Sequence, residues 1–484
     1  MARSISEATS QKVDDEHLAG FEKVRAGMKL DNLPPLALRL RIEDLAQQPV
    51  HDCRILPDPL NSVTVFSGFL RSLLMDIPAP SMMPLPALFD QAMTMRLLKR
   101  ETTIPVPKTY HFDASCDNQL SCPFILMEYI AGRPLYDVWF DQTITPDLLA
   151  IRHSRILQDV AEAVTQLNKY EYSPGGAVLF DKDEKPSNIG PFRKVNMNAM
   201  LARSRDDGYD GYDGSTIFSS VGPFIDNESF MTRLLDNREP LSDNYSQGLY
   251  KLLKLFIDLA LSHDNGKSHE AGFVLTHPDL DLQNVIVSEE GGLLSLIDWD
   301  GVIAVPRCLG NERYPSWLTR DWDPVKYRYD EDAFPGPGCP NNRENSPTEL
   351  EFYRRKYQEI VKQISSPDHA RRTANSLVLE NLHIAADDPV CTDSIIEKIF
   401  DEVKAKTVSA ESAQASYTGA STSTDGQSKI GEGENHGGED EDDDDDDDSV
   451  DFFFPYEVAT GLISGEIEGS DLQWLKDGFL ALLS

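Results

Sequence analysis

The stretch THPDLDLQNVIV, residues 276–287, and the stretch LSLIDWDG, residues 294–301, decide the fold and the chemistry of this chain. Between them lies SEEGG, a turn whose two glycines can adopt positive φ angles. The apolar residues Val285–Val287 and Leu293–Ile297 on either side of the turn indicate two short strands. The sequence therefore predicts an antiparallel hairpin whose outer ends lie together.

Polar side chains stand at those outer ends. Asn284 precedes the first strand and Asp298 follows the second, and an amide oxygen with a carboxylate suits Mg²⁺, which completes its shell with water and phosphate oxygens. Asp279 lies one loop upstream, where a carboxylate could accept a proton from, or orient, an attacking hydroxyl. The spacing His277-x-Asp279-x-x-x-x-Asn284 is that of the kinase catalytic loop. We expect His277 to order this loop by hydrogen bonding more than to transfer protons.

Two further carboxylates lie close enough in sequence to join a metal shell. Asp281 and Asp300 each have an alternative role as a capping or solvated carboxylate, and that role is the more common one. The neighbouring Trp299 and the more distant Trp317 are expected to serve packing.

These motifs resemble the aminoglycoside phosphotransferase and choline kinase family, and more narrowly fungal proteins of the phosphotransferase family. The segments TTIPVPKTYHFDA and PFILMEYIAGRPL, residues 102–114 and 123–135, are similar to the strand and hinge of that family. The resemblance covers roughly residues 53–364 and implies an α+β, protein-kinase-like fold with two lobes. It implies ATP and Mg²⁺ as cofactors and transfer of the γ-phosphoryl group to a hydroxyl of a small-molecule acceptor, whose identity stays open. Backbone groups of Glu128, Tyr129 and Ile130 would then contact adenine; the alternative is an ordinary core strand.

The N-terminal lobe departs from the family pattern. Kinases of this type use a glycine-containing phosphate loop, a strand Lys that meets the phosphates and a helix Glu that pairs with it. Here the loop position is Leu60–Phe66, without glycine, the Lys position falls on Met75 or Asp76, and the Glu position falls on Gln91. Two classes of function therefore stay open: an active small-molecule kinase, or a catalytically impaired kinase-like protein that binds or scaffolds partners.

Composition narrows the partners and the compartment. The formal net charge is -36, and much of the excess lies in EDEDDDDDDD, residues 439–448, a run that indicates a solvated tail. Such acidity disfavours nucleic-acid binding, which needs Lys and Arg. Six scattered cysteines indicate a reducing compartment. We expect a cytoplasmic chain that does not bind membranes, because no secretory signal and no membrane-length apolar run is present.

Helical periodicity and composition divide the chain further. Residues 86–101 are expected as a helix with Leu88, Ala92, Met95 and Leu98 on its buried stripe, and residues 247–263 as a helix that is apolar on most sides. The C-terminal segment is expected to be amphipathic and to dock on the helical lobe or on a protein partner. The predicted parts are an N-terminal extension (1–45), the N-lobe (46–127), the helical C-lobe (128–386), a terminal helix (387–406), an acidic disordered linker (407–450) and the amphipathic segment (451–484).

Overall fold

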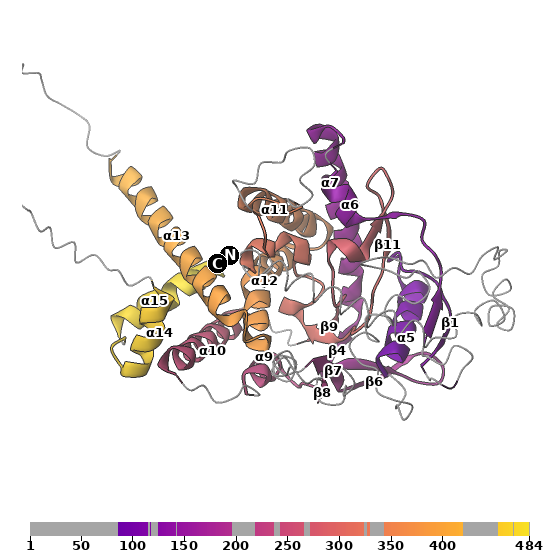
Figure 1. Ribbon diagram of the computed structural model, residues 1–484, viewed down its shortest axis with the longest axis horizontal. Helices are drawn as coiled ribbons and strands as arrows, with labels where there is room; N and C mark the ends of the chain where they lie inside the picture. The colour runs from indigo at the N-terminus through magenta and orange to yellow at the C-terminus, as the bar shows by residue number, and fades with distance from the viewer. Residues whose placement is uncertain are drawn as a thin grey trace, which may run out of the picture. The chain divides into compact units, whose positions relative to one another are not determined.

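The computed structural model describes a defined set of residues, and Figure 1 shows their path (86–114, 117, 124–141, 143–195, 218–236, 243–265, 272–323, 327–329, 343–419, 454–467 and 469–483). The N-terminal extension, the expected phosphate loop and the positions of Met75 and Asp76 lie outside the described residues. Within the described part of the chain, none of the helices combines the length and the apolar character needed to cross a membrane. The described chain divides into two compact units, which are treated separately below.

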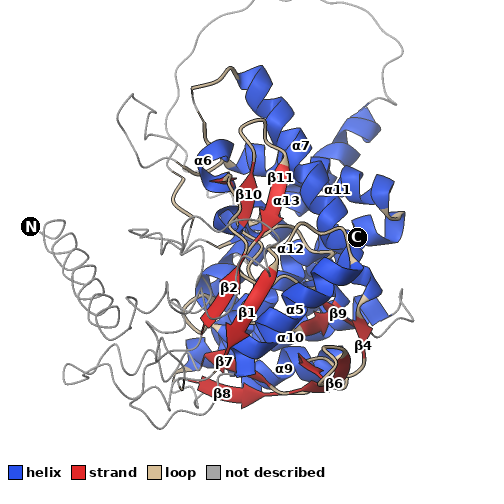
Figure 2. Cartoon of the chain, turned by 90° about the vertical axis from the view of Figure 1, so that its right-hand side faces the viewer, coloured by secondary structure: helices blue, strands red, loops and turns tan. Residues whose placement is uncertain are grey.

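The first unit contains a small α+β lobe in which one helix packs on two strands. Its elements are α5 (Pro86–Glu101), β1 (Thr109–Asp113) and β2 (Phe124–Met127), and the strands pair antiparallel (Figure 2). Ala92, Met95 and Leu98 of α5 are buried in the main core, as their helical spacing predicts. This lobe leads directly into the helical lobe through residues 128–132.

The helical lobe is built from short strands and longer helices. Its elements follow in chain order: β3 (Arg133–Pro134), α6 (Leu135–Trp139), α7 (Pro146–Val164), η2 (Thr165–Lys169), β4 (Glu171–Tyr172), β5 (Ala177–Phe180), β6 (Pro186–Gly190), β7 (Phe192–Val195), β8 (Phe218–Val221), α9 (Asn227–Asp236), β9 (Phe273–Leu275), η4 (Leu282–Asn284), β10 (Val285–Val287), β11 (Leu293–Leu296), β12 (Ala304–Pro306), η5 (Arg307–Leu309), η6 (Ser316–Leu318), η7 (Arg320–Trp322), α11 (Pro347–Ile364) and the first part of α12 (Pro367–Asp387).

Two three-stranded sheets organise the centre of this lobe. One has the order β11-β10-β3 and the other β12-β9-β4, with every pairing antiparallel. The predicted hairpin is confirmed as β10 and β11, with Val285 opposite Leu296. Helix α7 packs beside β11 and α11, so the hairpin carries its loops on a buried, rigid support.

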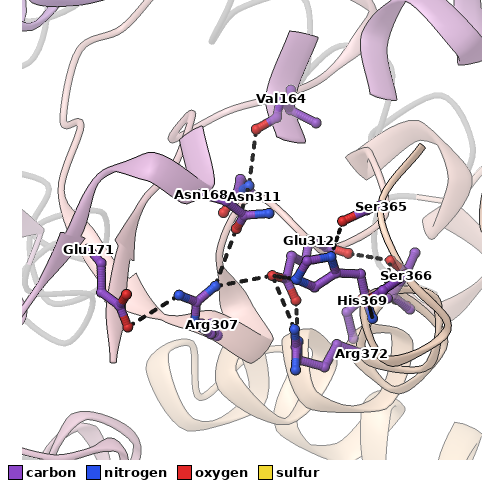
Figure 3. A network of polar contacts seen from close by, with 12 residues as sticks. Val164, Asn168, Glu171, Arg307, Asn311, Glu312, Ser365, Ser366, His369 and Arg372 are labelled. Atoms are coloured by element: carbon purple, nitrogen blue, oxygen red, sulfur yellow. Dashed lines mark hydrogen bonds and ion pairs between the residues drawn. The ribbon is translucent and has the colours of Figure 1, made fainter. Parts of the chain in front are cut away.

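A buried ion network joins the segment after β12 to α12 (Figure 3). The carboxylate of Glu312 pairs with Arg307 (3.2 Å), with Arg372 and with the ring of His369 (3.1 Å). Its side chain is 1% exposed, while those of Arg307 and Arg372 are 11% and 9% exposed. Arg307 also pairs with Glu171 (3.2 Å), whose side chain is half exposed, so Glu312 is the buried carboxylate that both guanidinium groups share.

The described residues of the second unit are mainly helical. The helices are α10 (Asn244–Asn265), α13 (Thr392–Gly419), α14 (Pro455–Ser464) and α15 (Ser470–Leu482), together with the end of α12. Helix α14 packs on α10 and α15 packs on α13, and Phe256 stacks on Phe479 with ring centroids 4.6 Å apart. At the α10–α14 contact, Gly248 lies so close that an added Cβ would meet the Ala459 carbonyl oxygen at 2.0 Å.

These packings correct two boundaries predicted from the sequence. The α10 segment, assigned to the helical C-lobe of residues 128–386, groups instead with the C-terminal helices, because its apolar sides meet α13, α14 and α15. The linker predicted to begin at residue 407 begins no earlier than 420, because α13 continues to Gly419. The acidic run of residues 439–448 lies outside the described residues.

Candidate functional site

The hairpin holds Asn284 and Asp298 at the same end. The Ile297 N–H donates to the Asn284 carbonyl (2.9 Å), which extends the β10–β11 ladder by one pair beyond Val285 and Leu296. Asp298 is the next residue after Ile297. The main chain therefore brings the two predicted metal ligands to neighbouring positions at the open end of the hairpin, as the sequence predicts.

The side chain of Asn284 is oriented by Asp279. Its Nδ2 donates to the Asp279 carbonyl (2.8 Å) and to Asp279 Oδ2 (2.9 Å), and Gln283 Nε2 donates to the same Oδ2 (3.1 Å). Because both amide donations of Asn284 go to Asp279, its Oδ1 faces away from Asp279. An oxygen held in this way is a suitable ligand for a hard cation.

His277 is a buried ordering group. Its Nε2 donates to the Ile297 carbonyl (2.9 Å), and its Nδ1 accepts from the Asp279 N–H (3.2 Å), an arrangement that requires the neutral ring. Burial lowers the pKa of His277 to about 4. The ring therefore connects the loop of Asp279 to the strand that precedes Asp298 and carries no charge near neutral pH.

Two arginines anchor the loop, and neither is predicted from the sequence. Arg320 Nη2 pairs with Asp281 Oδ2 (2.6 Å), while Asp281 Oδ1 accepts from the Leu282 N–H (2.8 Å) and caps η4. Arg313 Nη2 donates to the His277 and Pro278 carbonyls, both at 3.3 Å. Asp281 therefore has the capping role. The sequence signal for its partner Arg320 is weak, because Arg320 is one of three arginines in residues 307–320.

The turn after β11 has an unusual backbone. Asp298 has φ +62°, the left-handed region that an L-residue with a Cβ rarely adopts, and Gly301 has φ +75°. Trp299 is fully buried and donates from Nε1 to the Leu296 carbonyl (3.1 Å), so it packs as expected. Burial lowers the pKa of Arg193 in β7, and the charge of Asp300 opposes that shift. Asp300 thus interacts with Arg193 as well as lying two residues from Asp298.

The donor set matches a cation that takes few protein ligands. Within the described ranges, no cluster of three or more His, Cys, Asp or Glu side chains could hold a metal ion, which disfavours a closed transition-metal site there. Asn284 and Asp298 supply two oxygen donors at one end of a rigid hairpin, and Mg²⁺ usually needs no more than one or two carboxylates plus phosphate and water. These residues therefore suit the Mg²⁺ that the family resemblance implies.

The predicted hinge is partly committed to internal bonds. The Glu128 N–H donates to the Lys108 carbonyl (2.9 Å), and Glu128 Oε2 accepts from the Lys108 N–H (3.0 Å). Tyr129 is exposed and Ile130 is half-buried. Of the backbone groups expected to contact adenine, the Glu128 amide is thus already bonded to the neighbouring strand.

Gln91 occupies the position expected for the helix Glu. Its side chain is 2% exposed, and its Nε2 has no hydrogen-bond partner among the described residues. A buried amide of this kind normally finds a partner, because leaving it unsatisfied costs about 1–3 kcal/mol. Gln91 is therefore a polar side chain among the buried apolar side chains of α5.

Comparison with known proteins relates part of the chain to one enzyme family. Residues 67–302 match the model of the phosphotransferase enzyme family. Two curated relatives are both named altered inheritance of mitochondria protein 9, mitochondrial: that of Eremothecium gossypii is 25% identical over 273 residues, and that of Lachancea thermotolerans is 23% identical over 284 residues. The alignments cover 48% and 50% of this chain but 44% and 45% of the relatives, so the chain spans less than half the length of the relatives it matches.

Solved structures give low-identity similarities. An ethanolamine kinase of Plasmodium vivax is 12% identical, with 66% of this chain and 69% of that chain covered and a TM-score of 0.30. Aminoglycoside 2′-phosphotransferase-IIIa in its GDP complex is 14% identical, with 69% and 83% covered and a TM-score of 0.32. The element order described above and the family match together give the α+β, protein-kinase-like fold. The matched residues 67–302 include both the hairpin and the loop of Asp279, so the part of the chain that carries the candidate site is similar to the phosphotransferase enzyme family.

Proposed function

We propose that this chain is an ATP-dependent phosphotransferase that transfers the γ-phosphoryl group to a hydroxyl of a small-molecule acceptor. The observation that supports it most is the bonding of Asp279. Two amides, from Asn284 and Gln283, hold one oxygen of its carboxylate at the end of the hairpin that also carries Asp298. A carboxylate fixed beside two oxygen ligands is the arrangement that hydroxyl phosphorylation requires.

Each group has a separate role in this proposal. Asp279 orients the acceptor hydroxyl and accepts its proton, because its carboxylate plane is set by the two amide donors. Asn284 and Asp298 would hold Mg²⁺, which when bound neutralises charge on the phosphates. His277 stays neutral and keeps the loop in place through its two backbone bonds.

A second candidate follows from Gln91. A neutral amide there cannot form the ion pair that positions a phosphate-binding Lys, and the expected Lys position falls on Met75 or Asp76. The alternative is therefore a catalytically impaired kinase-like protein that binds or scaffolds a partner. The two curated relatives, whose names describe mitochondrial inheritance rather than a reaction, are compatible with either candidate.

Thermal shift of the full chain with Mg·ATP tests the proposal directly. Stabilisation by Mg·ATP that is lost in Asp298→Asn but kept in Asp279→Asn supports the assigned roles, because only Asp298 is proposed to hold the metal. Glu289→Gln in the hairpin turn is the matched control, since its ion pair with Arg133 is exposed. No stabilisation of the unmodified chain at millimolar Mg·ATP would favour the impaired candidate.

A four-member cycle separates the candidates further. Asp76→Lys together with Gln91→Glu should strengthen Mg·ATP binding more than either change alone, because each residue needs the other to hold its position. One restored charge-assisted bond contributes about 1.5–3 kcal/mol, or roughly tenfold to hundredfold in affinity. Calorimetric affinities that show no coupling between the two positions contradict this pairing.

Both relatives are named as mitochondrial, so imaging of a tagged full chain compares that compartment with the cytoplasm.

A further inference from the structure

The turn between β5 and β6 holds a strained residue. This hairpin tip, Asp181–Lys185, is closed by Asp181 Oδ1, which accepts from the Asp183 N–H (2.8 Å) and the Lys185 N–H (3.0 Å). Glu184 donates its N–H to the Asp181 carbonyl (3.1 Å) and has φ +59°. That turn position favours Gly or Asn, because a Cβ crowds the backbone there. The sequence thus has a glutamate where a glycine would be less strained.

The strained residue contacts α5 through two atoms. Its carboxylate forms an ion pair with Arg96, and its carbonyl accepts from Arg100 Nη2 (3.4 Å). Arg96 also donates from Nη2 to the Tyr110 carbonyl of β1 (3.3 Å) and lies 5.2 Å from the Phe112 ring centroid. A glycine at position 184 would relieve the backbone but remove the carboxylate. Strain retained at a contact residue indicates that the contact has a use.

The same helix is connected to the hinge. Lys99 Nζ donates to the Val106 carbonyl (2.9 Å) and lies 3.8 Å from Glu128 Oε2. The basic residues in the last two turns of α5 therefore reach both the hairpin tip and the hinge. Gln91 lies on this helix, without the charge that would pair it with a phosphate-binding Lys.

We propose that Glu184 is a positioning residue, which acts through Arg96 and Arg100 to fix α5 against β1 and the hinge. This inference rests on the proposed function, because the spacing that it fixes is that of the nucleotide site. In kinases of this fold an internal Lys–Glu pair positions the corresponding helix. Here the contact with the hairpin tip holds the helix from outside.

The test compares Glu184→Gly with Asp183→Gly in the full chain. Hydrogen exchange of residues 91–101 should become about two- to fivefold faster in Glu184→Gly, the range expected for a partly exposed ion pair, and stay unchanged in the Asp183→Gly control. The affinity for Mg·ATP, measured by calorimetry, should fall by a similar factor. Arg96→Met should have the same two effects, and combining it with Glu184→Gly should add nothing further.

The outcomes separate the positioning role from the proposed function. Unchanged exchange of α5 in Glu184→Gly overturns the inference, whether or not the chain binds nucleotide. Faster exchange with unchanged Mg·ATP affinity also overturns it, because the contact would then be structural only. If the unmodified chain binds no Mg·ATP, the proposed function fails, and the positioning of a nucleotide site fails with it, while the exchange result still reports whether Glu184 holds the helix.

Discussion

Replacing Glu312 with Gln should destabilise the chain more than replacing any exposed carboxylate. Gln keeps the size of the side chain and one acceptor oxygen but removes the charge that Arg307 and Arg372 share. Both guanidinium groups stay charged, and their side chains are only 11% and 9% exposed, so neither can recover full hydration. The perturbation therefore leaves Arg372 without a buried counter-charge, while Arg307 keeps only its pair with the half-exposed Glu171.

The magnitude follows from that burial. Breaking a buried ion pair by removing one partner costs about 3–5 kcal/mol, because the other partner is left uncompensated. At about 2–4 °C per kcal/mol for a large domain, the loss corresponds to a fall in Tm of roughly 6–20 °C. The neighbouring bond from the Thr373 hydroxyl to the Glu312 carbonyl (2.7 Å) uses only the main chain of residue 312 and should persist. The loss is thus assigned to the carboxylate.

Urea titration and calorimetry of the full chain measure the effect. Glu289→Gln is the control, since its pair with Arg133 is 67% and 42% exposed and should contribute less than about 1 kcal/mol. A Glu312→Gln variant within 1 kcal/mol of that control refutes the reasoning. It would mean that water reaches Arg372, or that the pair of Arg307 with Glu171 is enough to compensate its charge.

The remaining predictions concern the C-terminal helices and the buried histidines. Gly248→Ala should lower stability by about 1–3 kcal/mol despite the better helix propensity of Ala, because its Cβ would overlap the Ala459 carbonyl; Ser262→Ala, exposed on the same helix, is the control in thermal unfolding. Deleting residues 454–484 should cause a large loss of Tm, since it exposes Phe256; an unchanged transition would show that α14 and α15 add nothing. Burial lowers the pKa values of His153 and His277 from 6.5 to about 4, so the stability that the two neutral rings contribute is complete above pH 6.5 and declines as the pH falls toward 4. The decline is at most about 1.4 kcal/mol per pH unit for each histidine. In His153→Gln, the free energy of unfolding measured by urea titration should therefore fall less between pH 6.5 and 4.5 than in the unmodified chain.

The hairpin and its loop could be predicted because their signals are local. Two apolar strands joined by one glycine-containing turn, between Val285 and Ile297, determine the pairing of β10 with β11. Asp279 and Asn284 are separated by one short turn. The helix of residues 86–101 and its buried stripe follow from periodicity in the same way. Such features depend on residues within about twenty positions, which one sequence is enough to read.

The missed features depend on contacts between distant segments. Arg320 is far from Asp281 in sequence, and Glu184 is farther from Arg96, so no spacing rule connects them. The apolar sides of α10 predict burial but not the partner, which is why its grouping with α13, α14 and α15 was missed. The positive φ of Glu184 was missed for another reason, because glutamate is an unfavourable residue at that turn position.

The loop of Asp279 and helix α5 are stabilised by separate contacts. Asn284, Arg313 and Arg320 hold the loop from within the helical lobe, whereas Glu184 and the hinge hold α5. A change at Gln91 therefore leaves the loop folded, and an active and an impaired phosphotransferase would share the same loop geometry. What separates these two candidates is whether the neutral amide of Gln91 can replace the helix Glu of active kinases. Its Nε2 is buried and has no partner among the described residues.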